Sequence, residues 1–130
     1  MPDEIIWLEE AVVLAIHEAQ LAEHGGGAGI RDAGLLSSAL ARPRNAAAYS
    51  NPDVPKLAAL YAVGVIGNHP FVDGNKRVGT VLLETFLELH DYVLVASDAE
   101  LLRAIMAFAA SETSERAFTD WVRGHAKQRT

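Results

Sequence analysis

The chain has 130 residues, of which 50% are hydrophobic and 22% charged, a composition typical of one globular domain and not of a disordered chain. Its 17 acidic and 11 basic side chains give a net charge of −6, which disfavours broad, phosphate-driven binding to nucleic acid. The absence of cysteine excludes disulfides, zinc–thiolate sites and thiol nucleophiles, and it permits a reducing cytoplasm.

The hydrophobic periodicity of the N-terminal part is helical. A first helix is predicted over about residues 4–23, and the glycine-rich residues 25–29 end it. A second helix is predicted to begin after Asp32, whose side chain can cap it. Pro43 follows, and residues 42–51 are predicted to be the only long irregular stretch.

The third predicted helix, about residues 53–68, is apolar on nearly every face. Such a helix belongs at the centre of a bundle, where the other helices surround it. Asn51 and Pro52 are interpreted as its N-cap and its first helical residue.

The rest of the chain is also mainly helical in pattern. A fourth helix is predicted over about residues 75–90, and residues 92–95 form a short candidate extended segment. Ser97 and Glu100 make a capping box before a fifth helix, and Ser114 can cap the last. The fold class expected is a compact all-α bundle of about six helices.

A polar segment between the third and fourth predicted helices carries the candidate chemistry. Gly74 and Asn75 stand where a helix begins, so free backbone N–H groups and the helix dipole favour an anion there. Lys76 and Arg77 add positive charge suited to phosphate oxygens.

The same segment offers a metal ligand and a base. Asp73 supplies a hard carboxylate of the kind that binds Mg²⁺ together with substrate phosphates, and His69 can act as a general base near neutral pH. These groups suit phosphoryl or nucleotidyl transfer. Spacing alone leaves a second interpretation open, in which His69 and the Asp-Gly-Asn sequence are only turn residues.

Residues 69–77, His-Pro-Phe-Val-Asp-Gly-Asn-Lys-Arg, resemble the signature loop of the Fic/Doc superfamily, His-Pro-Phe-x-(Asp/Glu)-Gly-Asn-(Gly/Lys)-Arg, at every position. Residues 24–26 with 29–32, followed by residues 35–43, look like the upstream block of its death-on-curing (Doc) branch, the toxins of type II toxin–antitoxin systems. The resemblance implies one Fic/Doc domain over residues 1–130.

The resemblance also implies a role for each motif residue. His69 would deprotonate a target hydroxyl, Asp73 would hold Mg²⁺, and Phe71 would be a structural anchor. The phosphates of ATP would lie against the remaining residues of the motif: Gly74, Asn75 (also through its side-chain amide), Lys76 and Arg77.

The branch decides the reaction that the resemblance implies. Typical Fic proteins transfer AMP, with glycine at the position of Lys76 and a second arginine at that of Thr80. Doc-type toxins carry the lysine, lack that arginine, and in the founding group transfer the γ-phosphate of ATP to a threonine of elongation factor Tu, arresting translation. Gly74 departs from the alanine of the Doc pattern. We predict a Doc-type protein kinase that uses Mg²⁺ and ATP and acts on elongation factor Tu, with AMP transfer or a catalytically degenerate binding module as alternatives.

Fic proteins are often restrained by a helix with the pattern Ser/Thr-x-x-x-Glu-Gly/Asn. Ser111 and Glu115 have this spacing, but Arg116 follows, so a helix-capping cluster is the preferred interpretation. No internal inhibitor is predicted. The resemblance then implies a separate antitoxin whose C-terminal segment folds onto a groove near the site.

Other patterns are interpreted as structural. Residues 25–29 lack the preceding strand of a phosphate loop, so they are expected only to end a helix. His17 and His90 lack the further ligands of a metal site, and Arg31 and Asp32 are expected to form a structural pair that supports the site.

Neither a membrane span nor a signal peptide is predicted. The longest apolar run, from Leu57 to Gly67, is too short to cross a bilayer, and the N-terminal residues 1–4 are acidic where a signal peptide is basic. We therefore expect a cytoplasmic protein without membrane or direct nucleic-acid partners.

Overall fold

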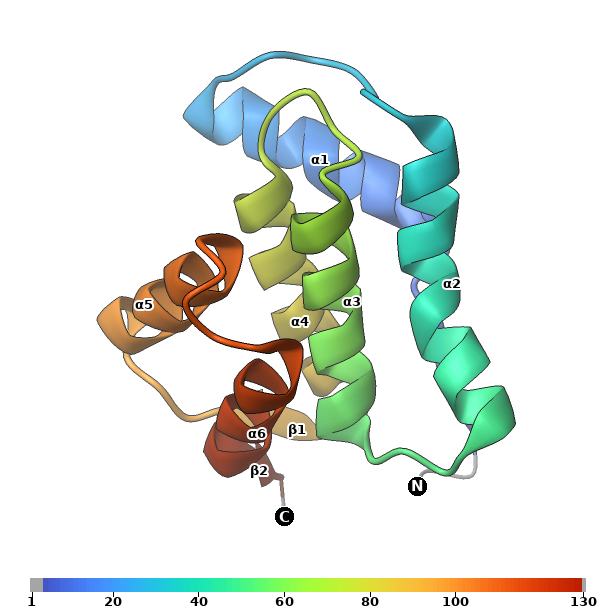
Figure 1. Ribbon diagram of the computed structural model, residues 1–130, viewed down its shortest axis with the longest axis vertical. Helices are drawn as coiled ribbons and strands as arrows, with labels where there is room; N and C mark the ends of the chain where they lie inside the picture. Colours follow the sequence, from blue (N-terminus) through green and yellow to red (C-terminus); the bar gives the residue numbers. More distant parts are fainter. Residues whose placement is uncertain (1–3, 130) are drawn as a thin grey trace.

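The computed structural model describes residues 4–129, and within them the chain forms six α-helices and one two-stranded antiparallel ribbon (Figure 1). The all-α prediction is therefore confirmed. None of these helices has the length and hydropathy needed to cross a membrane. The elements are α1 (Glu10–His24), α2 (Ala33–Tyr49), α3 (Val54–Asn68), α4 (Asn75–Leu89), β1 (Tyr92–Leu94), α5 (Asp98–Ala109), α6 (Glu115–His125) and β2 (Ala126–Gln128).

Helix α3 occupies the centre of the bundle, as its apolar sequence predicts. It packs against α2 on one side and against α4 and α6 on the other (Figure 1). From Val54 to Ile66 every residue except Lys56 is buried. A helix surrounded in this way is fixed by packing along its whole length, so its C-terminal end is a rigid place from which to present a side chain.

Helices α2 and α3 approach each other closely at Gly64. A Cβ atom added to Gly64 would lie 3.0 Å from the carbonyl oxygen of Ala39 and 3.2 Å from its Cα. That carbonyl has no helical partner four residues later, because Pro43 lacks an N–H group. Only a residue without a side chain allows the two backbones to lie this close.

We expect Gly64→Ala to lower the free energy of unfolding by about 1–3 kcal/mol, because backbone atoms have to move to admit the methyl group. Gly67→Ala in the same helix is the matched control. Nothing lies within 4 Å of a Cβ added at Gly67, so alanine there should stabilise by about 0.5–1 kcal/mol. Urea unfolding followed by circular dichroism measures both; changes of the same sign would contradict this account of the α2–α3 contact.

The predicted irregular stretch over residues 42–51 is wrong, because α2 continues to Tyr49 with Pro43 inside it. Pro43 is buried, and Ala46 and Ala47 pack against the core. This tertiary burial offsets the one backbone hydrogen bond that proline removes.

Two predicted helix starts also differ from the structure. Helix α1 begins at Glu10 instead of about residue 4, because side chains elsewhere bind the preceding backbone: Leu8 donates its N–H to the Tyr61 hydroxyl at 2.9 Å and Ile6 donates to Nε2 of His90 at 2.9 Å. At α3 the N-cap is Asp53, which accepts from the N–H of Lys56 at 3.0 Å, and not Asn51.

The C-terminal part closes the bundle with local signals that the sequence carries. Ser97 and Glu100 form the predicted capping box of α5, and Ser114 caps α6 by accepting from Ala117. The predicted extended segment is β1, and it pairs with β2, which was not predicted.

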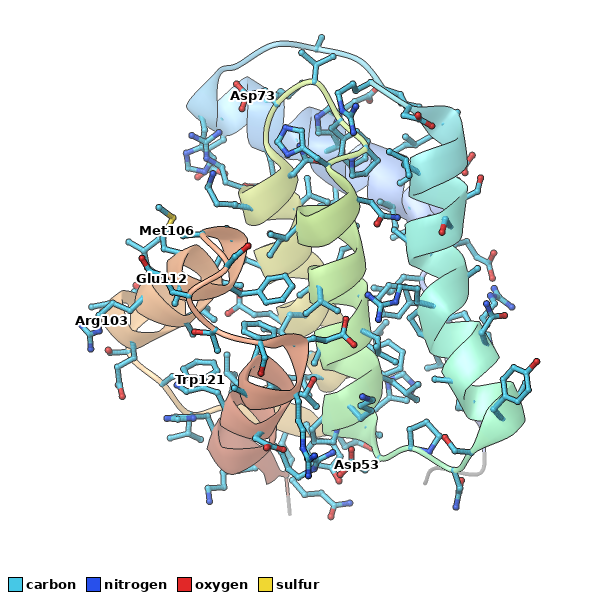
Figure 2. All side chains as sticks on the ribbon, in the orientation of Figure 1. Asp53, Asp73, Arg103, Met106, Glu112 and Trp121 are labelled. Atoms are coloured by element: carbon cyan, nitrogen blue, oxygen red, sulfur yellow. The ribbon has the colours of Figure 1, made fainter. Side chains whose placement is uncertain are left out.

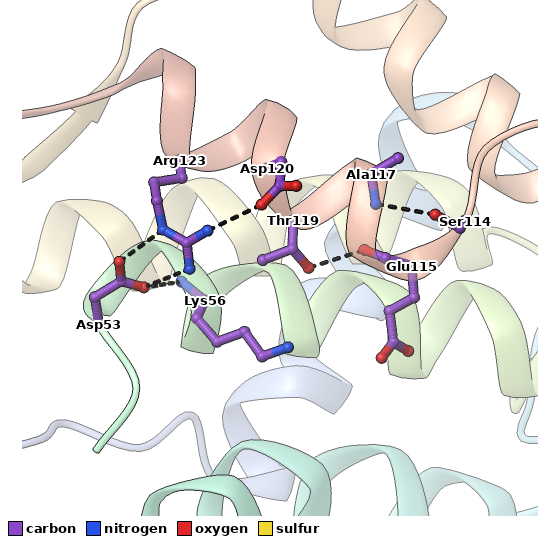
Figure 3. A network of polar contacts seen from close by, with 8 residues as sticks. All are labelled: Asp53, Lys56, Ser114, Glu115, Ala117, Thr119, Asp120 and Arg123. Carbon is purple, nitrogen blue, oxygen red and sulfur yellow. Dashed lines mark hydrogen bonds and ion pairs between the residues drawn. The ribbon is translucent and has the colours of Figure 1, made fainter. Parts of the chain in front are cut away.

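Helix α6 is tied to the start of α3 by charge (Figure 3). Arg123 donates to the Asp53 carboxylate at 2.8 and 3.2 Å, and to Asp120 at 3.1 Å. These contacts hold α6 at the end of α3 opposite to the one that carries His69.

Candidate active site

The joint between α3 and α4 brings the predicted site residues together. His69 is the C-cap of α3 in the left-handed conformation (φ 54°, ψ 54°), and Gly74 is the N-cap of α4 with φ 85°. Both caps turn the chain sharply, so one helix ends and the next begins around a common cavity of about 150 Å³. The residues lining it are His69, Asp73, Gly74, Asn75, Lys76 and Arg77.

This cavity lies at the end of the bundle where Asp73 is labelled in Figure 2, far from Asp53. A larger cavity of about 640 Å³ lies beside Asp53, between the start of α3 and α6. Its lining contains three acidic, three basic and four uncharged residues, and no residue of the motif contributes to it. The chemistry predicted from the sequence therefore belongs to the smaller cavity.

The N-terminus of α4 is open to a ligand. Within residues 4–129 no side chain caps this helix, and its regular hydrogen bonds begin with Val78 N–H donating to the Gly74 carbonyl at 2.9 Å. The N–H groups of the first turn and the helix dipole therefore favour an anion at this point. Lys76 and Arg77 are exposed beside it.

Asn75 also has a structural role in the loop. Its side chain is 3% exposed, and both of its polar ends bind the backbone of Phe71: Oδ1 accepts from Phe71 N–H and Nδ2 donates to the Phe71 carbonyl, each at 3.0 Å. The Asn75 amide thus joins the two ends of the loop segment 71–75. One hydrogen of the Nδ2 group is used in this way and the second is not, so the predicted contact of the Asn75 side chain with phosphate stays a prediction.

Phe71, for which the resemblance implies the role of a structural anchor, is a core residue. Its side chain is fully buried, and its ring stacks on that of His17 with centroids 3.9 Å apart. The anchored residue thus lies below the loop while its neighbours Val72 and Asp73 remain exposed.

The Asp73 carboxylate is held by two backbone N–H groups. Oδ1 accepts from Gly74 at 2.8 Å and Oδ2 from Gly27 at 3.4 Å. These bonds, the one from Gly74 first, lower the pKa of Asp73 below its ordinary value of 3.8. An ionised carboxylate beside an anion site fits Mg²⁺, which binds through one or two carboxylates together with phosphates and water. In the described part of the chain no group of three or more acidic or histidine side chains forms a ready-made metal cage.

The titration of Asp73 can be observed directly. We expect the Gly74 amide proton to titrate with a midpoint below 3.8. Because the folded pKa is lowered, the stability that these bonds supply is present above the unfolded value and is lost as the pH falls through the folded one. NMR spectra recorded against pH measure this, with Asp73→Asn as the control in which the Gly74 signal no longer titrates. A midpoint at or above the ordinary value would show that the two bonds are not formed in solution.

Three parts of the N-terminal half support this site: the glycine-rich residues 25–29, Arg31 and His17. The glycine-rich segment ends α1 at Gly25, as predicted, but it also packs on the motif, where Gly29 accepts from the N–H of Val72 at 3.1 Å. A Cβ added to Gly26 would lie 2.6 Å from Oδ2 of Asp73. The sequence interpretation missed this contact, since glycine at a helix end has a sufficient local explanation.

Arg31 holds the end of α3. Its guanidinium donates to the carbonyl of His69 at 2.7 Å and to that of Asn68 at 3.0 Å. Asp32 instead caps α2 by accepting from Leu35 N–H at 2.9 Å. The two neighbours do not bind each other, so the predicted Arg31–Asp32 pair is wrong, although Arg31 does support the site.

His17 and His90, the two histidines interpreted as structural, are both buried. His90 is a satisfied core residue, because Nδ1 donates to the Phe86 carbonyl at 2.8 Å and Nε2 accepts from Ile6. His17 lies below the motif loop, with Nε2 2.9 Å from the Asp73 carbonyl oxygen. Neither forms a metal site with other side chains among the described residues.

Comparison with known proteins decides the family. Residues 7–87, more than half of the chain, match the sequence model of the Fic/DOC family, and they span α1, α2, α3 and all but the last two residues of α4. The chain belongs to the Fic/Doc family. The matched part of this Fic/Doc chain contains the motif loop and every N-terminal residue found to support it.

Two relatives of this Fic/Doc chain carry the Doc name. Toxin Doc of Mycolicibacterium smegmatis is 40% identical over 83 residues, which are 62% of each chain, so the match spans less than two thirds of that toxin. Protein kinase doc of Escherichia phage P1 is 29% identical over 112 residues, 85% of this chain and 88% of the phage protein. The resemblance to the Doc branch is confirmed.

Proposed function

We propose that this protein is a Doc-type toxin that transfers the γ-phosphate of Mg·ATP to a serine or threonine hydroxyl of a target protein. The observation that carries the proposal is the α3–α4 joint. There an exposed imidazole, an ionised carboxylate and an uncapped helix N-terminus with two cations surround one cavity. These are the groups that phosphoryl transfer needs, because positioning and charge neutralisation carry most of that catalysis.

Each step follows from the chemistry of these residues. His69 accepts the proton of the target hydroxyl as its oxygen attacks the γ-phosphorus. The bond from this phosphorus to the β,γ-bridging oxygen breaks, and ADP leaves. Lys76, Arg77 and the first-turn N–H groups of α4 bind the phosphate oxygens. Asp73 would hold Mg²⁺, which when bound neutralises charge on the phosphates.

Two residues of α4 favour phosphate transfer over AMP transfer. Thr80 stands where typical Fic proteins carry a second arginine, and its hydroxyl donates to the Lys76 carbonyl at 2.8 Å. A short neutral side chain bound to its own helix cannot replace a bidentate guanidinium on a nucleotide. Lys76 replaces the glycine of those proteins, and one relative is named a protein kinase.

The proposal includes a target, a partner and a place. The target is elongation factor Tu, whose phosphorylation arrests translation, and both target and toxin are cytoplasmic.

In residues 111–116 Arg116 stands where an internal inhibitory helix would carry glycine or asparagine. A separate antitoxin therefore restrains the toxin. Expression of the chain alone should arrest growth; normal growth during strong expression would contradict the toxin proposal.

Labelled ATP tests the reaction. The purified protein is incubated with Mg²⁺ and elongation factor Tu, or a cytoplasmic extract, and with ATP labelled on either the α- or the γ-phosphate. We expect the γ-label on one protein band and no α-label. Transfer of the α-label alone would replace the kinase by an AMP transferase. If neither label is transferred while ATP still raises the melting temperature, the protein is a binding module.

A further inference from the structure

His17 is a buried residue whose hydrogen bond and ring stacking both involve residues of the motif loop. Its side chain projects from α1 and is 4% exposed, and it lies outside the lining of the cavity. Nε2 is 2.9 Å from the carbonyl oxygen of Asp73. A carbonyl oxygen only accepts hydrogen bonds, so Nε2 carries the hydrogen and donates it.

The imidazole ring also contacts the residues on both sides of this bond. It stacks on Phe71 with an interplanar angle of 11°. Its Cδ2 atom lies 3.7 Å from the place that a Cβ of Gly74 would take. His17 is therefore in contact with the loop both before and after Val72, and its ring borders the space that a side chain at Gly74 would enter.

Packing alone does not explain a histidine here. A phenylalanine or leucine would fill the space below Phe71 without a polar group to satisfy. The imidazole adds one directed bond, and that bond ends on the backbone of Asp73. The adjacent N–H, that of Gly74, is in turn bound by the Asp73 carboxylate at 2.8 Å. The Asp73 carbonyl and the Gly74 N–H belong to the same peptide unit. The orientation of this unit therefore fixes the direction of the Asp73 carboxylate.

We propose that His17 is a positioning residue that holds Asp73 in the orientation in which it binds the divalent cation. This inference rests on the proposed function, because that function assigns the cation to Asp73. Loss of the Nε2–H donor frees the Asp73–Gly74 peptide to rotate, so the carboxylate spends less time directed at the ion. Groups of this kind behind a metal ligand typically change metal affinity about 10–100-fold.

Two variants separate the donor from the ring. His17→Phe keeps an aromatic ring against Phe71 and removes the donor, whereas His17→Gln keeps an N–H donor and removes the ring. Mn²⁺ serves as the probe, and its binding to the full-length protein in the presence of ATP is measured by electron paramagnetic resonance. We expect the dissociation constant to rise about 10–100-fold in His17→Phe and less than about 5-fold in His17→Gln.

His90→Phe is the matched control, since His90 is the other buried histidine bound to a backbone carbonyl and packed on a phenylalanine, with ring centroids 4.1 Å apart. It lies at the opposite end of α4. This variant should lose stability without a change in Mn²⁺ affinity. The inference is overturned if His17→Phe binds Mn²⁺ like the wild type, or if His90→Phe weakens binding as much.

A measurement on the wild type covers the case in which His17→Phe does not fold. Long-range ¹H–¹⁵N spectra should show His17 as the Nε2–H tautomer, with ring signals that shift when Mg²⁺ is added to the ATP-bound protein. Ring signals whose chemical shifts do not change when Mg²⁺ is added would overturn the inference. Because Mn²⁺ binding needs no transfer, a chain that transfers no label but shows the His17→Phe effect refutes the proposed reaction and leaves the positioning role standing.

Discussion

His69→Asn is expected to lower the rate of label transfer at least about 100-fold, because asparagine cannot take up the hydroxyl proton and the remaining carboxylate of the cavity, that of Asp73, is a weak base with a lowered pKa. The fold should be unaffected. His69 is exposed and adopts φ 54° and ψ 54°, a left-handed conformation that asparagine tolerates better than alanine does. Initial rates with γ-labelled ATP measure the loss, and urea unfolding checks the stability.

His24→Asn is the matched control for this experiment. His24 is an exposed histidine at the end of α1, and it does not line the cavity. The same substitution there should leave the rate unchanged. If His69→Asn retained more than about a tenth of the wild-type rate, a catalytic base would not be needed and the assignment of His69 would fail.

Phe71→Ala is expected to lower the free energy of unfolding by about 3–5 kcal/mol, the usual effect of removing a buried phenylalanine side chain. Phe71 is fully buried and stacks on His17. The loop above it, including Asp73, would lose its support together with the core contact. Urea unfolding followed by circular dichroism measures the change.

Val72→Ala is the neighbouring control. Val72 is 51% exposed, so its truncation should change stability by no more than about 0.5 kcal/mol. A loss below about 1 kcal/mol in Phe71→Ala would mean that the loop does not depend on its buried ring, and the anchor role would be wrong.

The parts of the fold predicted correctly are those fixed by local chemistry. Ser97 and Ser114 cap the helices that follow them because an N-cap needs only backbone groups two or three residues away. The central position of α3 follows from its nearly continuous apolar sequence. The motif loop lies between two helices whose pattern the sequence shows clearly.

The incorrect predictions depend on distant partners. Pro43 stays within α2 because the helix is buried against α3, and residues 5–9 stay outside α1 because Tyr61 and His90 bind their backbone. The support of the site is also long-range: His17 binds a residue 56 positions away and Arg31 one 38 positions away. No local pattern can indicate such pairs.

The close packing of Gly26 on the Asp73 carboxylate has a genetic consequence. A methyl group added to Gly26 would lie 2.6 Å from Oδ2, and its φ of 119° already disfavours any other residue. Cells that survive selection against the toxin should therefore carry inactivating substitutions at Gly26 as well as in the motif. Such survivors would still produce a folded protein, because the glycine segment is exposed and contributes nothing to the core.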